Sequence, residues 1–427
     1  MRKNVALYTL GCKLNRYETD TIKTGFEKRG YKIVQFGEKA KVYVINTCTV
    51  TKRADDKCRR IIHYVTRNFP ESVIAVVGCY AQLNYKKIEQ IKGVDLILGN
   101  YEKFNLFDYL NENGKRKKPL VLCSGKNSSY KNEEIGYSTS RTRAYLKIQD
   151  GCSFNCTYCI VPLVRGKSRS RDENSILHQA QKLIDYGYKE IVLTGINLGD
   201  YKNGRGLTDL LKKIIKINGL KRLRLSSIEP NRFSDELIEL IAENNIICKH
   251  LHIPLQSGDN TILKRMGRKY SVSEYAEIIK KITGKIPNPG LGTDVITGFP
   301  GENENNFKNT FDFISKMPFS YLHIFGFSVR KGTTAEKMHD KLPATIIKKR
   351  SKILLELDKK KRKDFMKKFI GTTRKVLFES EDNSCFYSGF TDNYIRVKCR
   401  GKNLKNEIKD VYLKEINDKY IIGELVE

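Results

Sequence analysis

The chain of 427 residues is long enough for two or three domains, at roughly one domain per 150 residues. It carries 79 Lys and Arg against 48 Asp and Glu, and the net charge of +31 favours a polyanionic partner, nucleic acid ahead of an anionic membrane surface. A solvated, lysine-rich surface is the alternative explanation. No apolar run approaches the ~18 residues of a membrane-spanning helix, so we expect none.

Eleven cysteines are spread over this length, in an odd number and too sparsely for a disulfide scaffold. We therefore expect a cytoplasmic protein with reduced thiols, some of which bind metal. The first residues, MRKNVALYTLGCKLN, hold only a short apolar run, and polar and acidic residues follow it. They predict a first β-strand and not a signal peptide.

The N-terminal quarter alternates short apolar runs with helical patterns. Helices are predicted over Glu18–Arg29 and Lys52–Asn68. The strands predicted around them are Val5–Leu10, Val42–Thr47, Val73–Val77 and Val94–Leu98. Continuous apolar strands separated by helices predict a parallel α/β sheet.

Three cysteines follow three of these strands. Cys12 stands in LGC, Cys48 in NTC and Cys79 in VGC. Because the carboxyl ends of parallel strands share one edge of a sheet, the three thiols are expected to converge there. Chance placement is the alternative, and the shared position relative to the strands argues against it.

Residues 116–143 are polar and predict a linker with one short strand, Leu120–Cys123. Strand and helix patterns then alternate again as far as residue 330. The predicted strands are 144–148, 190–195, 222–227, 251–255, 293–298 and 321–327. About six such units predict a partial or full (β/α) barrel with its chemistry at the carboxyl ends of the strands.

A dense cysteine motif follows the first of these strands. DGCSFNCTYCIVP places Cys152, Cys156 and Cys159 in a Cys-x3-Cys-x2-Cys run. A structural zinc site normally has four protein ligands, whereas a [4Fe–4S] cube held by three thiolates keeps one iron open for a substrate or cofactor. A zinc knuckle or three unrelated buried thiols remain the alternatives.

The last part of the chain is basic and then β-rich. Residues 341–370 predict a helix with twelve Lys and Arg against three Asp and Glu, suited to RNA or to packing across the barrel. Residues 371–427 alternate in the manner of a small β-barrel. There Tyr387, Phe390 and Tyr394 suit either RNA stacking or a core.

These motifs together resemble the methylthiotransferase family of radical S-adenosylmethionine (SAM) enzymes over essentially the whole chain. VPLVRGKSRSR, SSIEP, HIPLQSG, TDVITGFPGE and FSVRKGTTA are similar to the family's barrel motifs. TLGCKLN, NTCTVT and GFTDNYIRV resemble most closely the MtaB type. The expected fold is therefore an N-terminal parallel α/β cluster domain, a partial (β/α) radical SAM barrel and a small C-terminal β-barrel of the TRAM kind.

The resemblance implies two [4Fe–4S] clusters, one on Cys152, Cys156 and Cys159 that also binds SAM, the other on Cys12, Cys48 and Cys79. It implies methylthiolation at carbon 2 of N6-threonylcarbamoyladenosine in the anticodon stem-loop of tRNA, with a low-potential electron donor. Isopentenyl-adenosine in tRNA and an aspartate of a ribosomal protein are the alternative substrates. A zinc-containing RNA-binding protein without catalysis is the alternative class.

Further residues are predicted to contact SAM. Tyr158 matches the aromatic that the family places near the adenine. Gly195, at a strand end, allows the backbone to approach SAM closely. Polar side chains at other strand ends face the predicted mouth of the barrel, where neighbouring backbone can also hold them; they are Glu229, Gln256, Ser257 and Asp294. The guanidinium groups of Arg165, Arg169 and Arg171 suit a SAM carboxylate or a tRNA phosphate.

The other cysteines and the histidines are expected to be structural. Cys58 shares a helix face with Ile61, Ile62 and Val65, which favours core packing over metal binding. The remaining cysteines, Cys123, Cys248, Cys385 and Cys399, are interpreted as small apolar residues. Only His250 and His252 have ligand spacing, and a structural role is expected for all six histidines.

The expected domain bounds follow from these changes along the chain. They are an N-terminal cluster domain over 1–115, a linker over 116–143, the barrel over 144–340, the basic helix over 341–370 and the RNA-binding module over 371–427.

Overall fold

The computed structural model describes residues 3–110, 114–123, 130, 141–382 and 386–426. The chain divides into two compact units. The first comprises 1–138, 149–172 and 328–336, and the second comprises 139–148, 173–327 and 337–427. The loop that carries Cys152, Cys156 and Cys159 therefore groups with the N-terminal sheet. The domain bounds expected from the sequence stay a prediction, and Cys385 lies outside the described residues.

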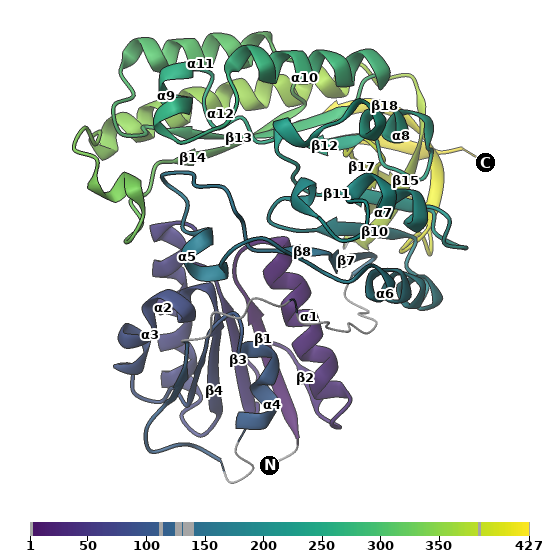
Figure 1. The fold of residues 1–427 in the computed structure, drawn as a ribbon. Helices are drawn as coiled ribbons and strands as arrows, with labels where there is room; N and C mark the ends of the chain where they lie inside the picture. The colour runs from purple at the N-terminus through teal and green to yellow at the C-terminus, as the bar shows by residue number, and fades with distance from the viewer. Residues whose placement is uncertain (1–2, 111–113, 124–129, 131–140, 383–385, 427) are drawn as a thin grey trace. The chain divides into compact units, whose positions relative to one another are not determined.

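A six-stranded parallel sheet forms the centre of the first unit (Figure 1), in the order β2-β1-β3-β4-β5-β6. Its strands are β1 (Asn4–Thr9), β2 (Lys32–Val34), β3 (Val42–Thr47), β4 (Val73–Gly78), β5 (Leu96–Leu98) and β6 (Leu120–Leu122). Every residue of β3 and β4 is buried, as expected of central parallel strands covered on both faces. The predicted parallel α/β sheet is confirmed.

Helices cover both faces of this sheet (Figure 1). Helices α1 (Lys13–Glu27) and α4 (Leu106–Tyr109) pack on one face through Ile22, Phe26 and Leu106. Helices α2 (Lys52–Asn68) and α3 (Cys79–Glu89) pack on the other through Ile62, Val65 and Ile88. The remaining elements of the unit are a 3-10 turn (Lys103–Asn105), the short β8 (Gln149–Asp150) and β9 (Arg169–Ser170) pair, and α5 (Val161–Arg165).

Sequence patterns located most of these elements. The predicted bounds of β3 and α2 match those observed. Helix α1 begins at Lys13 and not at Glu18, because Cys12 occupies its N-cap and Leu14 and Tyr17 extend its buried face. The edge strand β2 and helix α3 were not predicted, since β2 has three residues and α3 follows β4 without a loop.

Six parallel strands form the sheet of the second unit. Two three-stranded sheets have the orders β11-β10-β7 and β12-β13-β14, and parallel bridges such as Ser227 to His252 join them. The strands are β7 (Arg143–Lys147), β10 (Glu190–Thr194), β11 (Arg222–Leu225), β12 (His250–His252), β13 (Gly290–Thr297) and β14 (Tyr321–Gly326). The predicted partial barrel is confirmed. Strand β12 ends before Pro254, which has no N–H to donate to a ladder.

Helices alternate with these strands. They are α6 (Glu173–Asp185), α7 (Leu207–Ile214), α8 (Asp235–Glu243), α9 (Asn260–Arg265), α10 (Val272–Lys285), α11 (Glu304–Lys316) and α12 (Ala344–Lys367), with 3-10 turns at Leu198–Asp200, Pro230–Arg232 and Thr334–Lys337. Ser271 and Glu274 form a capping box that starts α10. Among the described helices, none is long and apolar enough to cross a bilayer.

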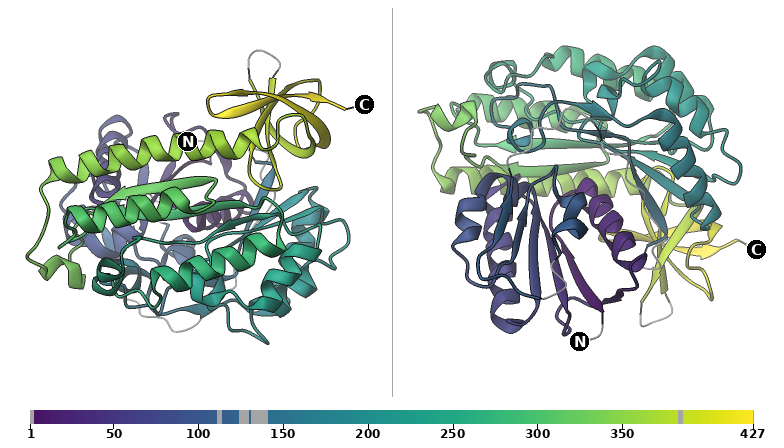
Figure 2. Two further views of the ribbon diagram at one scale, coloured as in Figure 1. Left: turned by 90° about the horizontal axis from the view of Figure 1, so that it is seen from above. Right: turned by 60° about the horizontal axis from the view of Figure 1, so that its bottom comes forward.

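A closed five-stranded barrel ends the second unit, in the order β15-β16-β17-β19-β18. Its strands are β15 (Thr373–Glu381), β16 (Phe386–Thr391), β17 (Arg396–Arg400), β18 (Ile408–Asn417) and β19 (Tyr420–Leu425). Figure 2 shows α12 running along the parallel sheet to this barrel, where Phe365, Met366 and Phe369 join the barrel core. The small C-terminal β-barrel is as predicted.

The barrel is fastened to the parallel sheet by two buried arginines of β11. Arg224 pairs with the fully buried Glu190 (Nε to Oε1, 2.7 Å) and also donates to the carbonyls of Thr391 and Asp392. Although burial alone would raise it, Arg224 holds the pKa of Glu190 below its usual range. Arg222 donates to the carbonyls of Phe390 and Lys375.

Aromatic rings complete this junction. Tyr394, in the left-handed region at φ 73°, stacks on His250 at 4.4 Å between ring centroids. Phe390 stacks on Tyr394, and Arg143 lies over the Phe390 ring. Tyr387 is buried in the barrel core. The structure therefore favours the core interpretation for Tyr387, whereas Phe390 and Tyr394 are half-buried and pack at the junction.

Replacing Arg224 tests this junction. Arg224→Ala removes the cation closest to the buried Glu190 carboxylate. This is expected to lower the free energy of unfolding by about 3–5 kcal/mol. Urea titration followed by circular dichroism measures the loss. Lys212→Ala removes the exposed ion pair with Glu236 and should leave the midpoint unchanged. Equal midpoints for the two variants would contradict a role of Arg224 in holding the barrel.

Candidate functional site

Cys12, Cys48 and Cys79 lie at one edge of the N-terminal sheet. They follow β1, β3 and β4, which are neighbours in the strand order. Cys12 is the N-cap of α1 and Cys79 is the first residue of α3. Helix N-termini stabilise negative charge, so two of the three thiolates stand where a helix dipole favours them.

Two glycines permit this approach. Gly11 has φ +102°, and a Cβ placed on it would lie 2.7 Å from Cys48 Cβ and 2.9 Å from Cys48 Sγ. Gly78 has φ +96°, and its Cβ would lie 2.4 Å from the Asn46 side-chain oxygen. Both positions need the left-handed conformation and the absence of a side chain. The GC dipeptides thus serve the convergence of the thiols.

Cys48 and Cys79 are buried, whereas Cys12 is exposed. Burial, with further contributions from Cys79 and Cys12, raises the pKa of Cys48 to about 12. Such a thiol keeps its proton at neutral pH until a metal replaces it. Asn100 donates to Cys79 Sγ at 3.5 Å. Three deprotonatable thiols, two helix N-termini and an N–H donor suit an anionic iron–sulfur cluster.

A network of buried charges surrounds these cysteines. Arg165, 2% exposed, donates to Glu18 and Asp150 at 2.8 and 2.9 Å and to the Asn15 side chain at 2.7 Å. Lys103, with no exposed surface, pairs with Glu18 at 2.6 Å and donates to Asn100 at 2.9 Å. The network runs from Asn15, beside Cys12, to Asn100, beside Cys79.

The second cysteine motif belongs to the same unit. Cys152, Cys156 and Cys159 lie between β8 and α5, and the backbone N–H of Phe154 donates to Cys152 Sγ at 3.4 Å. N–H donors to the sulfurs are typical of iron–sulfur ligands. Tyr158 lies half-buried between the second and third cysteine.

Helix α5 brings this loop against the first cysteine site. Ile160 and Val164 pack against Cys79, and Asn100 donates to the Val164 carbonyl at 2.8 Å. Segment 328–336 joins them through Arg330, which pairs with Asp55 of α2 and donates to Thr49, the residue after Cys48. The unit thus brings together two cysteine triplets that are distant in sequence.

The arginines predicted to bind SAM or phosphate have partners inside this unit. Arg165 donates to Glu18, Asp150 and Asn15. Arg171 donates to the Tyr17 hydroxyl at 2.9 Å, and Arg169 lies 3.5 Å from Asp150. Arg165 and Arg171 are buried. Their predicted ligand contacts stay predictions, whereas their contacts here order the unit.

The other predicted SAM contacts lie in the second unit. Gly195 is buried directly after β10. Ser257 is buried and bonded to Thr310 of α11 at 3.1 Å. Gln256 has φ 71°, a strained conformation for a non-glycine residue and one that occurs often at ligand sites. Burial raises the pKa of Glu229, and its ion pair with Arg268 partly offsets the increase.

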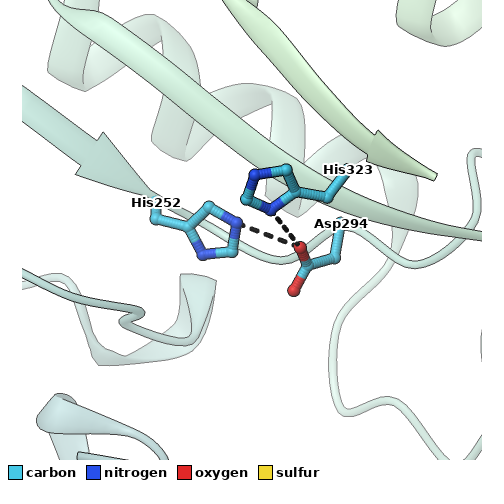
Figure 3. A group of neighbouring side chains, drawn as sticks. All are labelled: His252, Asp294 and His323. Atoms are coloured by element: carbon cyan, nitrogen blue, oxygen red, sulfur yellow. Dashed lines mark hydrogen bonds and ion pairs between the residues drawn. The ribbon is translucent and has the colours of Figure 1, made fainter. Parts of the chain in front are cut away.

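Asp294 has partners that the sequence did not predict. Figure 3 shows His252 and His323 both directed at its carboxylate. Although burial alone would raise it, the two imidazoles hold the pKa of Asp294 well below its usual range. The expectation that all histidines are structural did not foresee this cluster, because the three residues are remote in sequence.

Comparison with known proteins identifies the family. The models described as the radical SAM superfamily and the uncharacterized protein family UPF0004 match residues 146–314 and 4–99. A relative from Bacillus subtilis, threonylcarbamoyladenosine tRNA methylthiotransferase MtaB, is 39% identical over 99% of this chain and 96% of its own length. One of the same name from Aquifex aeolicus is 40% identical over 93% and 97%. The chain belongs to the radical SAM methylthiotransferase family.

A second branch of the family is nearly as similar. The tRNA-2-methylthio-N(6)-dimethylallyladenosine synthase of Clostridium botulinum is 35% identical over 98% of this chain and 92% of its own length. Among solved structures, the radical SAM methyltransferase TsrM from Kitasatospora setae matches with a TM-score of 0.55 at 14% identity, over 76% of this chain and 75% of that chain. That likeness concerns the fold.

As a radical SAM methylthiotransferase, the protein is an enzyme that uses SAM and two [4Fe–4S] clusters, as the sequence predicted. The resemblance and the fold class are likewise confirmed. The assignment of individual residues to these groups stays a prediction.

Substitution of Gly11 tests the first cysteine site. Gly11→Ala combines φ strain with a methyl group forced against Cys48, so we expect iron per chain to fall from roughly eight to roughly four after anaerobic reconstitution. Gly30→Ala is the matched control, because Gly30 also has positive φ but nothing within 4 Å of its Cβ. Equal iron contents would contradict the placement of Cys12 and Cys48 in one cluster site.

Proposed function

We propose that this enzyme methylthiolates carbon 2 of N6-threonylcarbamoyladenosine next to the anticodon of tRNA. The observation that carries the proposal is the joining of two cysteine triplets in one unit, with α5 packed against the helix that Cys79 starts. A sulfur-inserting enzyme needs both sites close together.

The proposed substrate is supported by relatives and by charge. MtaB proteins from Bacillus subtilis and Aquifex aeolicus are named for this nucleoside and align over nearly the whole chain. The net charge of +31 suits the anticodon stem-loop of a tRNA. A low-potential electron donor and a cytoplasmic location belong to the same proposal.

The cysteine triplets would hold the two clusters. Cys152, Cys156 and Cys159 would bind the cube that also takes SAM, and Cys12, Cys48 and Cys79 would bind the second cube. When bound, these groups supply a carbon-centred radical from SAM, able to remove the unreactive hydrogen of the adenine ring, and a sulfur atom within its reach. The thiols release their protons as the metal enters.

The buried charges would position and stabilise the second cluster. Arg165 and Lys103 are both buried against Glu18, so their positive charges are fixed near the thiols and poorly screened. Asn100 orients Cys79 and holds the Val164 carbonyl at the same time. These contacts hold the helix that follows Cys159 in a fixed position against Cys79.

In the second unit, Glu229 and Gln256 are the groups proposed to hold the polar parts of SAM. Glu229 is fixed by Arg268, which in turn lies over the Tyr270 ring, and its backbone N–H is held by Asn197. Gln256 is aimed by its left-handed backbone. Gly195, Ser257 and Asp294 remain further candidates, and Tyr158 remains the candidate beside the adenine.

Helix α12 offers an exposed basic surface for RNA. Its exposed lysines are Lys348, Lys349, Lys352, Lys359, Lys360, Lys363 and Lys367. Lys361 is different: it donates to the Ser315 and Met317 carbonyls, and burial lowers its pKa to about 8. The exposed lysines are therefore the ones proposed to contact phosphates.

Cysteine replacements separate the two proposed sites. Cys152→Ala should abolish SAM cleavage, and Cys12→Ala should spare SAM cleavage but abolish methylthiolation of tRNA. SAM cleavage is measured as the 5′-deoxyadenosine formed, and the methylthiolated nucleoside of the tRNA is measured by mass spectrometry. Cys58→Ala is the control, because Cys58 is buried beside Cys48 and is assigned to packing. Sulfur insertion by the Cys12 variant would refute the two-cluster proposal.

Nucleoside mass spectrometry of a deletion strain tests the substrate. Loss of the 2-methylthio form of threonylcarbamoyladenosine, restored by the wild-type chain, is the expected result. Loss from dimethylallyl-adenosine instead would assign the enzyme to the branch of the Clostridium botulinum relative. Loss from a ribosomal protein alone would exclude tRNA as the substrate.

Salt dependence of tRNA binding tests helix α12. We expect log Kd to rise linearly with log salt concentration, and Lys352→Ala and Lys363→Ala should each lower the slope by about 1. Lys212→Ala on α7 is the control with unchanged slope. Unchanged slopes in all three variants, measured by fluorescence anisotropy, would remove α12 from the interface.

A further inference from the structure

A cluster of two histidines and one aspartate lies on the parallel sheet of the second unit. His252 Nε2 is 3.0 Å and His323 Nδ1 is 3.2 Å from the same oxygen, Asp294 Oδ1 (Figure 3). The two nitrogens and the oxygen all lie within 4.8 Å of one another. Three potential ligand atoms thus converge on one point.

Strand register produces this convergence. Asp294 and His323 are direct partners in the pairing of β13 with β14, and His252 pairs with Gly292, two residues before Asp294 on the same face. Gly292 has no side chain to separate the imidazole from the carboxylate. Because side chains alternate along a strand, the register fixes all three on one face of the sheet.

We propose that His252, Asp294 and His323 bind one divalent transition-metal ion, with a set of ligands that includes none of the cysteines.

The donor set and its spacing suit such an ion. Two imidazoles and a carboxylate are the facial ligand set of many Fe²⁺, Zn²⁺ and Mn²⁺ sites, which leaves further coordination positions open. Neighbouring ligands at about 2.1 Å from one metal lie roughly 3.0–3.5 Å apart. The distances from Asp294 Oδ1 to the two imidazole nitrogens, 3.0 and 3.2 Å, fall in this range. Both imidazoles face Asp294 Oδ1, so Oδ2 is available as a further ligand of the ion.

The surroundings of the cluster resemble the second layer of a metal site. Ser227 Oγ lies 2.8 Å from His252 Nδ1, the ring nitrogen that faces away from Asp294. A metal-bound histidine usually gives its other N–H to such an acceptor, which fixes the tautomer and the ring plane. The Tyr321 ring lies 5.1 Å from that of His323 and 6.4 Å from that of His252, and restricts both.

Access to the cluster also favours binding of an ion. The His323 side chain is 50% exposed and that of Asp294 23% exposed, so an ion can enter without unfolding the sheet.

Manganese titration of the reconstituted enzyme tests the site. Both clusters are kept in the oxidised form, which gives no electron paramagnetic resonance signal. The six-line signal of free Mn²⁺ should then decrease on addition of the enzyme by an amount that corresponds to one bound ion per chain. Asp294→Asn keeps the shape of the side chain and His323→Ala removes an exposed ring, and each should weaken Mn²⁺ binding more than tenfold. Ser227→Ala should weaken it by about 10–100-fold. Zn²⁺ should displace Mn²⁺ at lower concentration.

His339→Ala is the matched control, since His339 is exposed in the same unit but lies outside the cluster, and its titration should equal that of the wild type. Thermal melting of each variant verifies folding. No Mn²⁺ bound by the wild type, or equal binding by the His323 and His339 variants, would overturn the proposal and leave the three side chains as a hydrogen-bonded cluster. These outcomes do not depend on the substrate of the enzyme.

Discussion

The first unit depends on one buried guanidinium. Arg165 ends α5, yet its partners come from α1 and β8, so a single side chain connects the loop of Cys152 to the helix that follows Cys12. Breaking a buried pair of this kind costs about 3–5 kcal/mol, because the carboxylates left behind stay in a medium of low polarity. Lys103 shares Glu18, which makes the network cooperative.

The second unit uses the same solution at another place. Arg224 is buried against Glu190 and donates to carbonyls of the C-terminal barrel. In the first unit, Arg165 likewise donates to side chains of segments that are far apart in sequence. In both units the buried cation joins chain segments that are far apart in sequence. Its planar group has five donors, so it can satisfy a carboxylate and backbone or amide oxygens at the same time. A lysine at either position would satisfy fewer of these oxygens.

The elements that local patterns define could be predicted, and the partners of long-range contacts could not. Continuous apolar runs predicted β3 and β4. The cysteine site at the sheet edge was predicted because each of its three cysteines, Cys12, Cys48 and Cys79, follows the end of a strand. By contrast, no local signal tells that Arg165 faces Glu18, 147 residues away. The grouping of 149–172 with the N-terminal sheet arises from such contacts, so sequence assigned that segment to the barrel alone.

His252, Asp294 and His323 show the same limit more sharply. Histidine spacing along the chain suggested only His250 and His252, which are i and i+2 on one strand face. In the sheet, however, the neighbours of a side chain come from adjacent strands, at separations of 42 and 29 residues here. His250 instead contacts Tyr321 and Tyr394 and supports the junction with the C-terminal barrel. The two histidines of this strand therefore have different hydrogen-bond partners, Tyr321 for His250 and Asp294 for His252, although they lie on the same face.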